Sequence, residues 1–259
     1  MTDLGNVYAA ARKRVTELTV GLTPEEAARV VPACPEWTVK DVLAHVAGVC
    51  DDVLTGNIEG VASDPWTAAQ VEKRKAVPVE GVLAEWADKA AQVEPLVEFF
   101  PGRVGEQFVL DMTTHEHDLR HALGAPGARE SDGVDVGVKF MVEVGFLANV
   151  ALRGLPPLEV VAGEHRWVTQ ERPAAEDVDT AIQEAAEAVL TGVTGPLLGD
   201  AGASAAGSLK VSAFELMRAL SGRRSLEEIR GFGWTVDPEP YLRAFQFGPF
   251  TTRPDALSE

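Results

Sequence analysis

The stretch that decides the fold is TVKDVLAHVAGVCDDVL, residues 38–54. The run TVKD at its start, residues 38–41, has the pattern of a helix N-terminus, and Gly56 lies just beyond its end, where a helix commonly stops. Its apolar residues return at the spacing of a helical face. The stretch therefore predicts a helix of about four turns with one buried side.

His45 lies on the buried side of this predicted helix, together with Val42 and Val49. A buried imidazole requires a hydrogen-bond partner or a metal ion. An ordinary core histidine bonded to a neighbour meets this requirement as well as a metal ligand does. The helix by itself leaves both interpretations open.

The same periodicity continues over roughly the first 150 residues. Long amphipathic helices joined by short loops are typical of an antiparallel bundle. Starts and stops are marked by capping residues, proline and glycine. Besides residues 38–54, the predicted helices are Leu4–Leu22, one that begins at Thr23-Pro24, a shorter one from Asp64, Pro78–Phe99, about Gly105–Leu123 and about Asp132–Arg153.

The pattern changes after Pro157. Leu158–Ala162 and Arg166–Thr169 are short runs rich in strand-forming residues, and the Gly163-Glu164 pair between them predicts a hairpin. Residues 192–208 are rich in glycine, alanine and serine and predict a mobile loop.

Three further segments after residue 157 have helical patterns, so the second part of the chain reads as α+β. We therefore expect a mainly α protein with a DinB-like antiparallel bundle over residues 1–155 and a smaller α+β domain over residues 156–259. The three segments are Asp177–Leu190, Ser212–Leu220 and a last segment with two helical turns, Leu226–Ile229 and Pro240–Phe245.

Charge argues against several classes of partner. The 259 residues include 40 acidic and 23 basic side chains, which gives a formal net charge of −17. Nucleic-acid binding depends on cations that displace condensed counterions, so we expect no nucleic-acid partner. The most apolar stretch, Val134–Leu152, is interrupted by charged side chains, so we expect no membrane span.

The cysteines and the opening residues favour a soluble cytoplasmic protein. Cys34 and Cys50 are too few for a disulfide framework, and both are expected to be small buried residues. The opening MTDLGNVYAA has neither a basic nor an apolar segment typical of a secretory signal. The sequence also lacks GxxxxGK[ST], GxSxG and HExxH, the motifs of common phosphate-binding and hydrolytic sites.

Histidine spacing indicates where chemistry could occur. Asp111 and His115 are four residues apart on a predicted helix, so both project from one face, with Asp118 about one turn further on. His45 from a neighbouring helix could supply a third ligand. Two histidines and one carboxylate leave coordination positions open, as in a catalytic metal site. The alternative is an ordinary surface pair at i,i+4 spacing.

His117 and His121 are also four residues apart, but they compete poorly for this role. They project well around the helix from His115, beside Glu116 and Arg120, which are expected to form their own ion pair. We expect the two histidines to lie on the surface.

Four segments together resemble one known family. Residues 34–48, CPEWTVKDVLAHVAG, resemble the first signature of the mycothiol-dependent maleylpyruvate isomerase family, whose members contain a DinB-like helical bundle. Residues 111–118, DMTTHEHD, are similar to its second metal motif. Residues 215–225, ELMRALSGRRS, and 237–242, DPEPYL, resemble segments of its C-terminal domain.

The resemblance implies a divalent metal, usually zinc, held by His45, Asp111 and His115, with Asp118 supporting them. This chain has Asp111 where the family pattern has glutamate. Aspartate is one methylene shorter, so either the helices approach more closely or the metal is held more weakly.

The resemblance also implies a reaction. The metal would lower the pKa of a low-molecular-weight thiol such as mycothiol, and the thiolate would add to an electrophilic substrate. Loss of the thiol after bond rotation gives isomerisation, and retention gives S-transfer. Arg223 or Arg224 could bind an anionic substrate; alternatively, these arginines cap a helix or pair with acidic residues.

The sequence thus predicts a metal-dependent, thiol-using isomerase or S-transferase that acts on a small molecule. Two alternatives remain open. One is a non-catalytic ligand-binding or regulatory module with a degenerate site, in which Asp111 and His115 only bond to each other. The other is a metal-dependent enzyme that uses no thiol.

Overall fold

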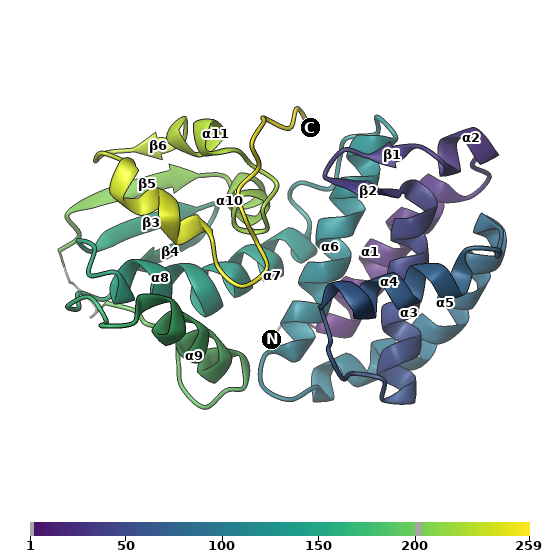
Figure 1. The fold of residues 1–259 in the computed structure, drawn as a ribbon, viewed down its shortest axis with the longest axis horizontal. Coiled ribbons are helices and arrows are strands. Elements are labelled where there is room, and N and C mark those ends of the chain that lie inside the picture. The colour runs from purple at the N-terminus through teal and green to yellow at the C-terminus, as the bar shows by residue number, and fades with distance from the viewer. Residues whose placement is uncertain (1–2, 200–203) are drawn as a thin grey trace. The chain divides into compact units, whose positions relative to one another are not determined.

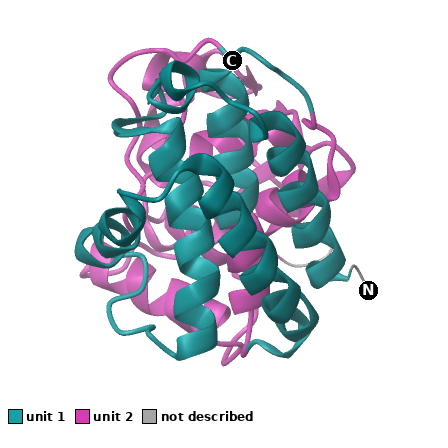
Figure 2. Cartoon of the chain, turned by 90° about the vertical axis from the view of Figure 1, so that its right-hand side faces the viewer, with its two compact units in different colours: residues 1–100, 111–127, 259 teal, residues 101–110, 128–258 magenta. Residues whose placement is uncertain are grey.

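The computed structural model describes residues 3–199 and 204–259. The chain is mainly α-helical, and its C-terminal part combines helices with a small sheet, so the predicted fold class is confirmed (Figure 1). Packing divides the chain into two compact units, which Figure 2 shows in different colours. The first comprises residues 1–100, 111–127 and 259, and the second comprises residues 101–110 and 128–258.

The first unit is built from helices that follow the predicted starts and stops closely. These elements are α1 (Leu4–Thr19), α2 (Pro24–Ala27), α3 (Val39–Thr55), α4 (Asp64–Arg74), α5 (Val79–Val93), the 3₁₀ segment η1 (Glu94–Phe99) and most of α6 (Val104–Ala122).

Two helix starts of the first unit carry a complete capping box. At α3, the Thr38 side chain accepts a hydrogen bond from the Asp41 backbone N–H at 3.2 Å, and the Asp41 carboxylate accepts one from the Thr38 N–H at 2.9 Å. Thr23 and Glu26 form the equivalent pair at α2. Each box satisfies two N–H groups that the first helical turn leaves without partners.

A short hairpin precedes α3, and the sequence analysis did not predict it. β1 (Val30–Val31) pairs antiparallel with β2 (Cys34–Thr38). The strands are short and Pro35 interrupts the second, so the segment lacks the alternation that marks a strand. The hairpin leads directly into α3 through Thr38.

The core of the first unit lies where α3 packs against α4 and α5. Val42 and Leu43 of α3 and Trp86 of α5 are fully buried. The indole N–H of Trp86 donates to the Tyr8 hydroxyl at 3.1 Å, and that hydroxyl lies 3.1 Å from the Cys50 sulfur. The packing of Trp86 and the polar contacts from Trp86 through Tyr8 to Cys50 therefore link α5, α1 and α3.

A buried ion cluster joins α1 to α6 within the same unit. The Glu116 side chain has no exposed surface, and Arg14 binds it through two nitrogen–oxygen contacts of 2.7 and 2.6 Å. Arg120 approaches the same carboxylate at 3.0 Å, so the predicted Glu116–Arg120 pair is confirmed. The two guanidinium groups neutralise a carboxylate that would otherwise be costly to bury.

The second unit packs helices against one four-stranded sheet in the order β4-β3-β5-β6. β3 and β4 form the predicted antiparallel hairpin, and β5 runs parallel to β3. The sheet comprises β3 (Leu158–Ala162), β4 (His165–Val168), β5 (Gly207–Val211) and β6 (Gly233–Trp234), and the helical elements are α7 (Asp132–Met141), η2 (Val142–Phe146), α8 (Leu147–Leu152), α9 (Val178–Leu190), α10 (Ala213–Leu220), α11 (Leu226–Arg230) and η3 (Glu239–Phe245).

Two features of this unit differ from the sequence-based expectations. The helix predicted over 132–153 contains a π-helical turn at η2, where Gly145 lies against the Phe247 ring. The predicted loop at 192–208 overlaps β5 at its last two residues, and its residues 200–203 lie outside the described part of the chain. β5 begins with glycine and contains polar residues, so its sequence does not look like that of a strand inside a sheet, although it lies between β3 and β6.

The domain boundary near Pro156 falls inside the second unit. A packing unit need not fold alone, so the boundary stays a prediction. None of the helices within residues 3–199 and 204–259 combines the length and apolar character needed to cross a bilayer.

We predict that Arg14→Ala destabilises the protein by about 2 kcal/mol, because it leaves the buried Glu116 carboxylate with a weaker set of counterions. Lys13→Ala is the matched control on the same helix. The Lys13 side chain is 76% exposed and its ammonium lies 3.8 Å from the Glu17 carboxylate, so we expect a change within about 0.5 kcal/mol. Urea denaturation followed by circular dichroism measures both. Equal destabilisation by the two substitutions would contradict the prediction.

Candidate metal centre

The candidate site lies in the first unit and begins with α3. The capping box fixes where this helix starts, and His45 follows two turns later with only 3% of its surface exposed. Its position on the buried side of the helix is as predicted. The hydrogen-bond partner that a buried imidazole requires comes from α4.

Gln70 of α4 holds the His45 ring. Its side-chain oxygen lies 2.7 Å from His45 Nδ1, and its amide nitrogen donates to Asp52 at 2.6 Å. Because the Asp52 carboxylate only accepts hydrogen bonds, it turns the amide oxygen of Gln70 toward the imidazole. Nδ1 of the neutral ring then carries the proton, which leaves a lone pair on Nε2 for a ligand.

Gly48 makes this contact possible. A Cβ atom at this position would lie 2.5 Å from Cβ of Gln70 and 2.6 Å from its Cγ. α3 and α4 therefore approach each other at a residue that has no side chain. Gly48 thus permits the contact between Gln70 and His45, and the glycine and the histidine belong to the same sequence motif, AHVAG.

α6 supplies the other two members of the candidate site. Asp111 and His115 lie four residues apart on this helix, as predicted, and Asp111 Oδ1 is 3.6 Å from His115 Nε2. The same oxygen is 3.6 Å from Nε2 of His45. The structure therefore brings together the three side chains that the sequence analysis selected.

The 3.6 Å separations fit three ligands around one cation better than they fit direct hydrogen bonds. A hydrogen bond to a carboxylate has a length of about 2.7–3.2 Å. Two ligand atoms that each lie about 2.1 Å from a tetrahedral ion are about 3.4 Å apart. The chemistry of the donors, two imidazoles and one carboxylate, also suits a borderline divalent metal.

The surroundings of the three side chains are unequal. The His45 and His115 side chains are 4% and 9% exposed, whereas the Asp111 side chain is 37% exposed. The Trp37 ring packs 5.0 Å from the His45 ring and 5.9 Å from the His115 ring. The site is thus covered on the tryptophan side and reachable beside the carboxylate.

The second nitrogen of His115 faces another pair of side chains. Nδ1 lies 3.2 Å from Asp118 Oδ2, and the Cys34 thiol donates to the same oxygen at 3.5 Å. Asp118 is completely buried, and it lies beside His115, as expected for a residue that supports this ligand. Cys34 is half-buried beside the site, so the expectation that it is merely a small buried residue is wrong.

The other histidines and the second cysteine have different outcomes. His117 is 4% exposed, so its predicted surface position is wrong, and His121 is half-buried. α6 is enclosed on nearly every side over residues 112–119, and no face of it there is free for surface residues. Cys50 is buried, as expected.

The two arginines proposed for substrate binding lie in the second unit. The guanidinium of Arg224 is buried and contacts Glu215 at 2.6 and 3.0 Å. Arg223 donates to the backbone oxygen of Ser221, the C-cap of α10, at 2.6 Å. These contacts match the alternative of helix capping and pairing with acidic residues.

Sequence reasoning did not find Gln70, Asp52 or Trp37 as parts of the site. Glutamine within a helix carries no signal, because the same residue type is common on solvated faces. The glycine at position 48, in the middle of a predicted helix, was the available clue, since such a glycine commonly has a packing reason.

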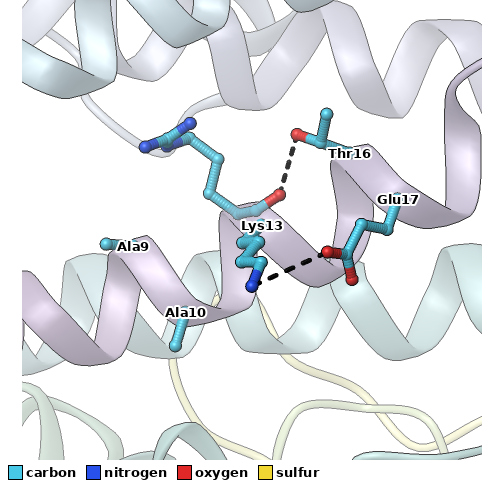
Figure 3. A pocket seen from close by; sticks show the side chains of 6 residues that line it. Ala9, Ala10, Lys13, Thr16 and Glu17 are labelled. Atoms are coloured by element: carbon cyan, nitrogen blue, oxygen red, sulfur yellow. Dashed lines mark hydrogen bonds and ion pairs between the residues drawn. The ribbon is translucent and has the colours of Figure 1, made fainter.

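Away from this cluster, α1 has a shallow pocket on its surface (Figure 3). Its lining comes from one helix, and Figure 3 shows the Lys13–Glu17 pair across it. It offers no group of metal-ligating side chains. It therefore does not compete with the His45–Asp111–His115 cluster as a candidate site.

Comparison with known families agrees with the geometry. Residues 8–123 match the family model described as mycothiol maleylpyruvate isomerase N-terminal domain. The suspected resemblance is thereby confirmed for this segment, which contains all the residues of the candidate metal centre and its DinB-like helical fold. No curated protein and no solved structure matches the chain.

We predict that the two thiols react at very different rates. Burial raises the pKa of Cys50 to about 11, so its thiolate fraction near pH 8 is on the order of one in a thousand. Titration with an aromatic disulfide reagent should show one accessible thiol in the folded protein, lost in Cys34→Ser and kept in Cys50→Ser. Equal rates for both thiols before unfolding would contradict the assigned burial.

Proposed function

Because residues 8–123 carry the mycothiol maleylpyruvate isomerase N-terminal domain, we propose that the protein is a divalent-metal-dependent isomerase or S-transferase. In this proposal it activates a low-molecular-weight thiol, mycothiol or one like it, for addition to a small electrophilic substrate. The observation that carries the proposal is the convergence of His45, Asp111 and His115, whose donor atoms lie within 4.8 Å of one another.

His45, Asp111 and His115 would hold the metal, and zinc is the ion that this donor set suits best. When bound, the metal would lower the pKa of the thiol, so that the thiolate is available near neutral pH. Asp111 has the most exposed side chain of the three, which leaves the side for the thiol next to the carboxylate.

The residues around the two histidines influence which ring nitrogen of each one faces the metal. The Gln70–Asp52 pair holds the proton of His45 on Nδ1, and Asp118 lies beside Nδ1 of His115. With its proton on Nδ1, His45 can present Nε2 toward the Asp111 oxygen, and Nε2 of His115 lies at the same distance of 3.6 Å from that oxygen. Trp37 covers the two rings and limits the access of water from its side.

The distances also bear on the two alternatives. A degenerate site in which Asp111 and His115 bond only to each other requires a contact shorter than the observed 3.6 Å, so the geometry favours a metal. A metal enzyme without a thiol shares the same ligands. It is distinguished by thiol dependence, which the assay below measures.

For an anionic substrate Arg223 is the proposed cation, because it is half-buried, whereas Arg224 is buried and paired with Glu215. We place the activity in the cytoplasm, where low-molecular-weight thiols stay reduced. Neither Cys34 nor Cys50, both within the described residues, forms a disulfide.

We predict that the purified protein binds close to one equivalent of a divalent metal and that His115→Ala loses it. His165→Ala is the control, because His165 lies in the second unit and pairs with Asp135. Elemental analysis measures the metal, and thermal unfolding with and without chelator measures its contribution to stability. Wild-type protein that contains no metal, with unfolding indifferent to chelator, would argue against the proposal.

The catalytic half of the proposal is tested with metal-loaded protein, mycothiol and a series of small activated alkenes. We expect conversion that requires both the thiol and the metal and that falls at least about a hundredfold in His115→Ala. Conversion without thiol would replace this proposal with a thiol-independent enzyme. Ligand binding without conversion would favour the regulatory module.

We also predict that Gln70→Leu weakens metal binding by about 10–100-fold, because the leucine cannot fix the proton on His45 Nδ1. Gln92→Leu is the matched control at an exposed position of α5. Competition with a chromophoric chelator measures both affinities. Equal affinities in the two variants would show that the Gln70 contact does not tune the ligand.

A further inference from the structure

The edge of His115 that faces away from Asp111 has ligands of its own. Nδ1 of this ring is buried and has no partner in hydrogen-bonding geometry, although Asp118 Oδ2 lies 3.2 Å from it. The whole residue is only 7% exposed. A buried ring nitrogen without an aligned partner is costly, so it indicates a missing ligand or a missing proton acceptor.

Cys34 completes a set of three donors at this edge. Its sulfur lies 3.5 Å from the same Asp118 oxygen, and the donor atoms of Cys34, Asp118 and His115 all lie within 4.8 Å of one another. β2 carries the cysteine, and α6 carries the other two, so the set joins segments far apart in sequence.

The separations again match the edges of a coordination sphere. Zinc–sulfur and zinc–oxygen bonds of about 2.3 and 2.1 Å place the sulfur and the oxygen about 3.6 Å apart around a tetrahedral ion. The corresponding nitrogen–oxygen edge is about 3.4 Å. The observed 3.5 and 3.2 Å agree with both.

We propose that Cys34, Asp118 and Nδ1 of His115 form a second seat for a thiophilic divalent ion. A neutral imidazole offers a lone pair on one nitrogen only, so His115 serves one seat at a time. The second seat is therefore an alternative to the His45–Asp111–His115 site. An ion on the cysteine side would leave His45 and Asp111 without their metal.

The simpler alternative is that the Cys34 thiol donates a hydrogen bond to Asp118 and binds nothing. The two interpretations differ in one observable, a bond between sulfur and metal. Co²⁺ reports such a bond directly, because a thiolate ligand adds a charge-transfer band in the near ultraviolet that imidazole and carboxylate ligands do not produce.

The experiment loads Co²⁺ into full-length His45→Ala, which lacks one ligand of the first site and keeps all three of the second. We expect one equivalent of bound Co²⁺ with a thiolate band. Adding Cys34→Ser should remove the band and weaken Co²⁺ binding at least about tenfold. Adding Cys50→Ser instead is the matched control and should change neither, because Cys50 is the buried cysteine of α3.

Asp111→Asn gives an independent background in case His45→Ala fails to fold, since its side chain is the most exposed of the first three ligands. Bound Co²⁺ without a thiolate band in a folded background overturns the proposal, as does a band that persists in Cys34→Ser or the absence of binding at millimolar Co²⁺. A band in these variants supports the second seat even if the wild-type protein shows no thiol-dependent activity, so the two proposals fail separately.

Discussion

The hydrogen bond between His45 and Gln70 is the contact on which the candidate site depends. An imidazole buried between helices must have one nitrogen satisfied before the other can bind a ligand. Here the satisfied nitrogen faces α4 and the other faces α6. Asp52 fixes the direction of the glutamine amide, and Gly48 allows the two helices to come close enough for the contact. The hydrogen bonds from Asp52 through Gln70 to His45 therefore decide which nitrogen of His45 carries the proton. Gly48 makes this arrangement possible because it has no side chain.

α6 performs several tasks with consecutive residues, because almost none of its surface between residues 112 and 119 is exposed. Asp111, His115 and Asp118 lie toward the candidate metal centre, while Glu116 points to Arg14 and Arg120. Because Arg14 belongs to α1, its contact with the buried carboxylate also restrains the rotation of α6 about its axis, whereas Arg120 belongs to α6 itself. The orientation of α6 that buries Glu116 against Arg14 is therefore the same orientation that directs Asp111 and His115 toward the candidate metal centre.

The sequence was sufficient for those parts of the structure that depend on local rules. Helix starts at Thr23 and Thr38, the hairpin after Pro157 and the i,i+4 pair of Asp111 and His115 all follow from capping, turn chemistry and helical spacing. Features decided by distant contacts were missed. His117 is covered because other elements enclose α6, and β5 is a strand because β3 pairs with it. Gln70 acts on His45 across a helix contact that no spacing rule contains.

The absence of a side chain at position 48 has a consequence for how related sequences are compared. Any larger residue there would push α4 away and remove the amide from His45, even if every metal ligand were unchanged. Loss of binding in a homologue could therefore begin at a residue that touches no ion. The pair of positions 48 and 70, small on one helix and amide-bearing on the other, should be inherited together, and a break in that pairing would identify inactive copies whose histidines and carboxylate are still intact.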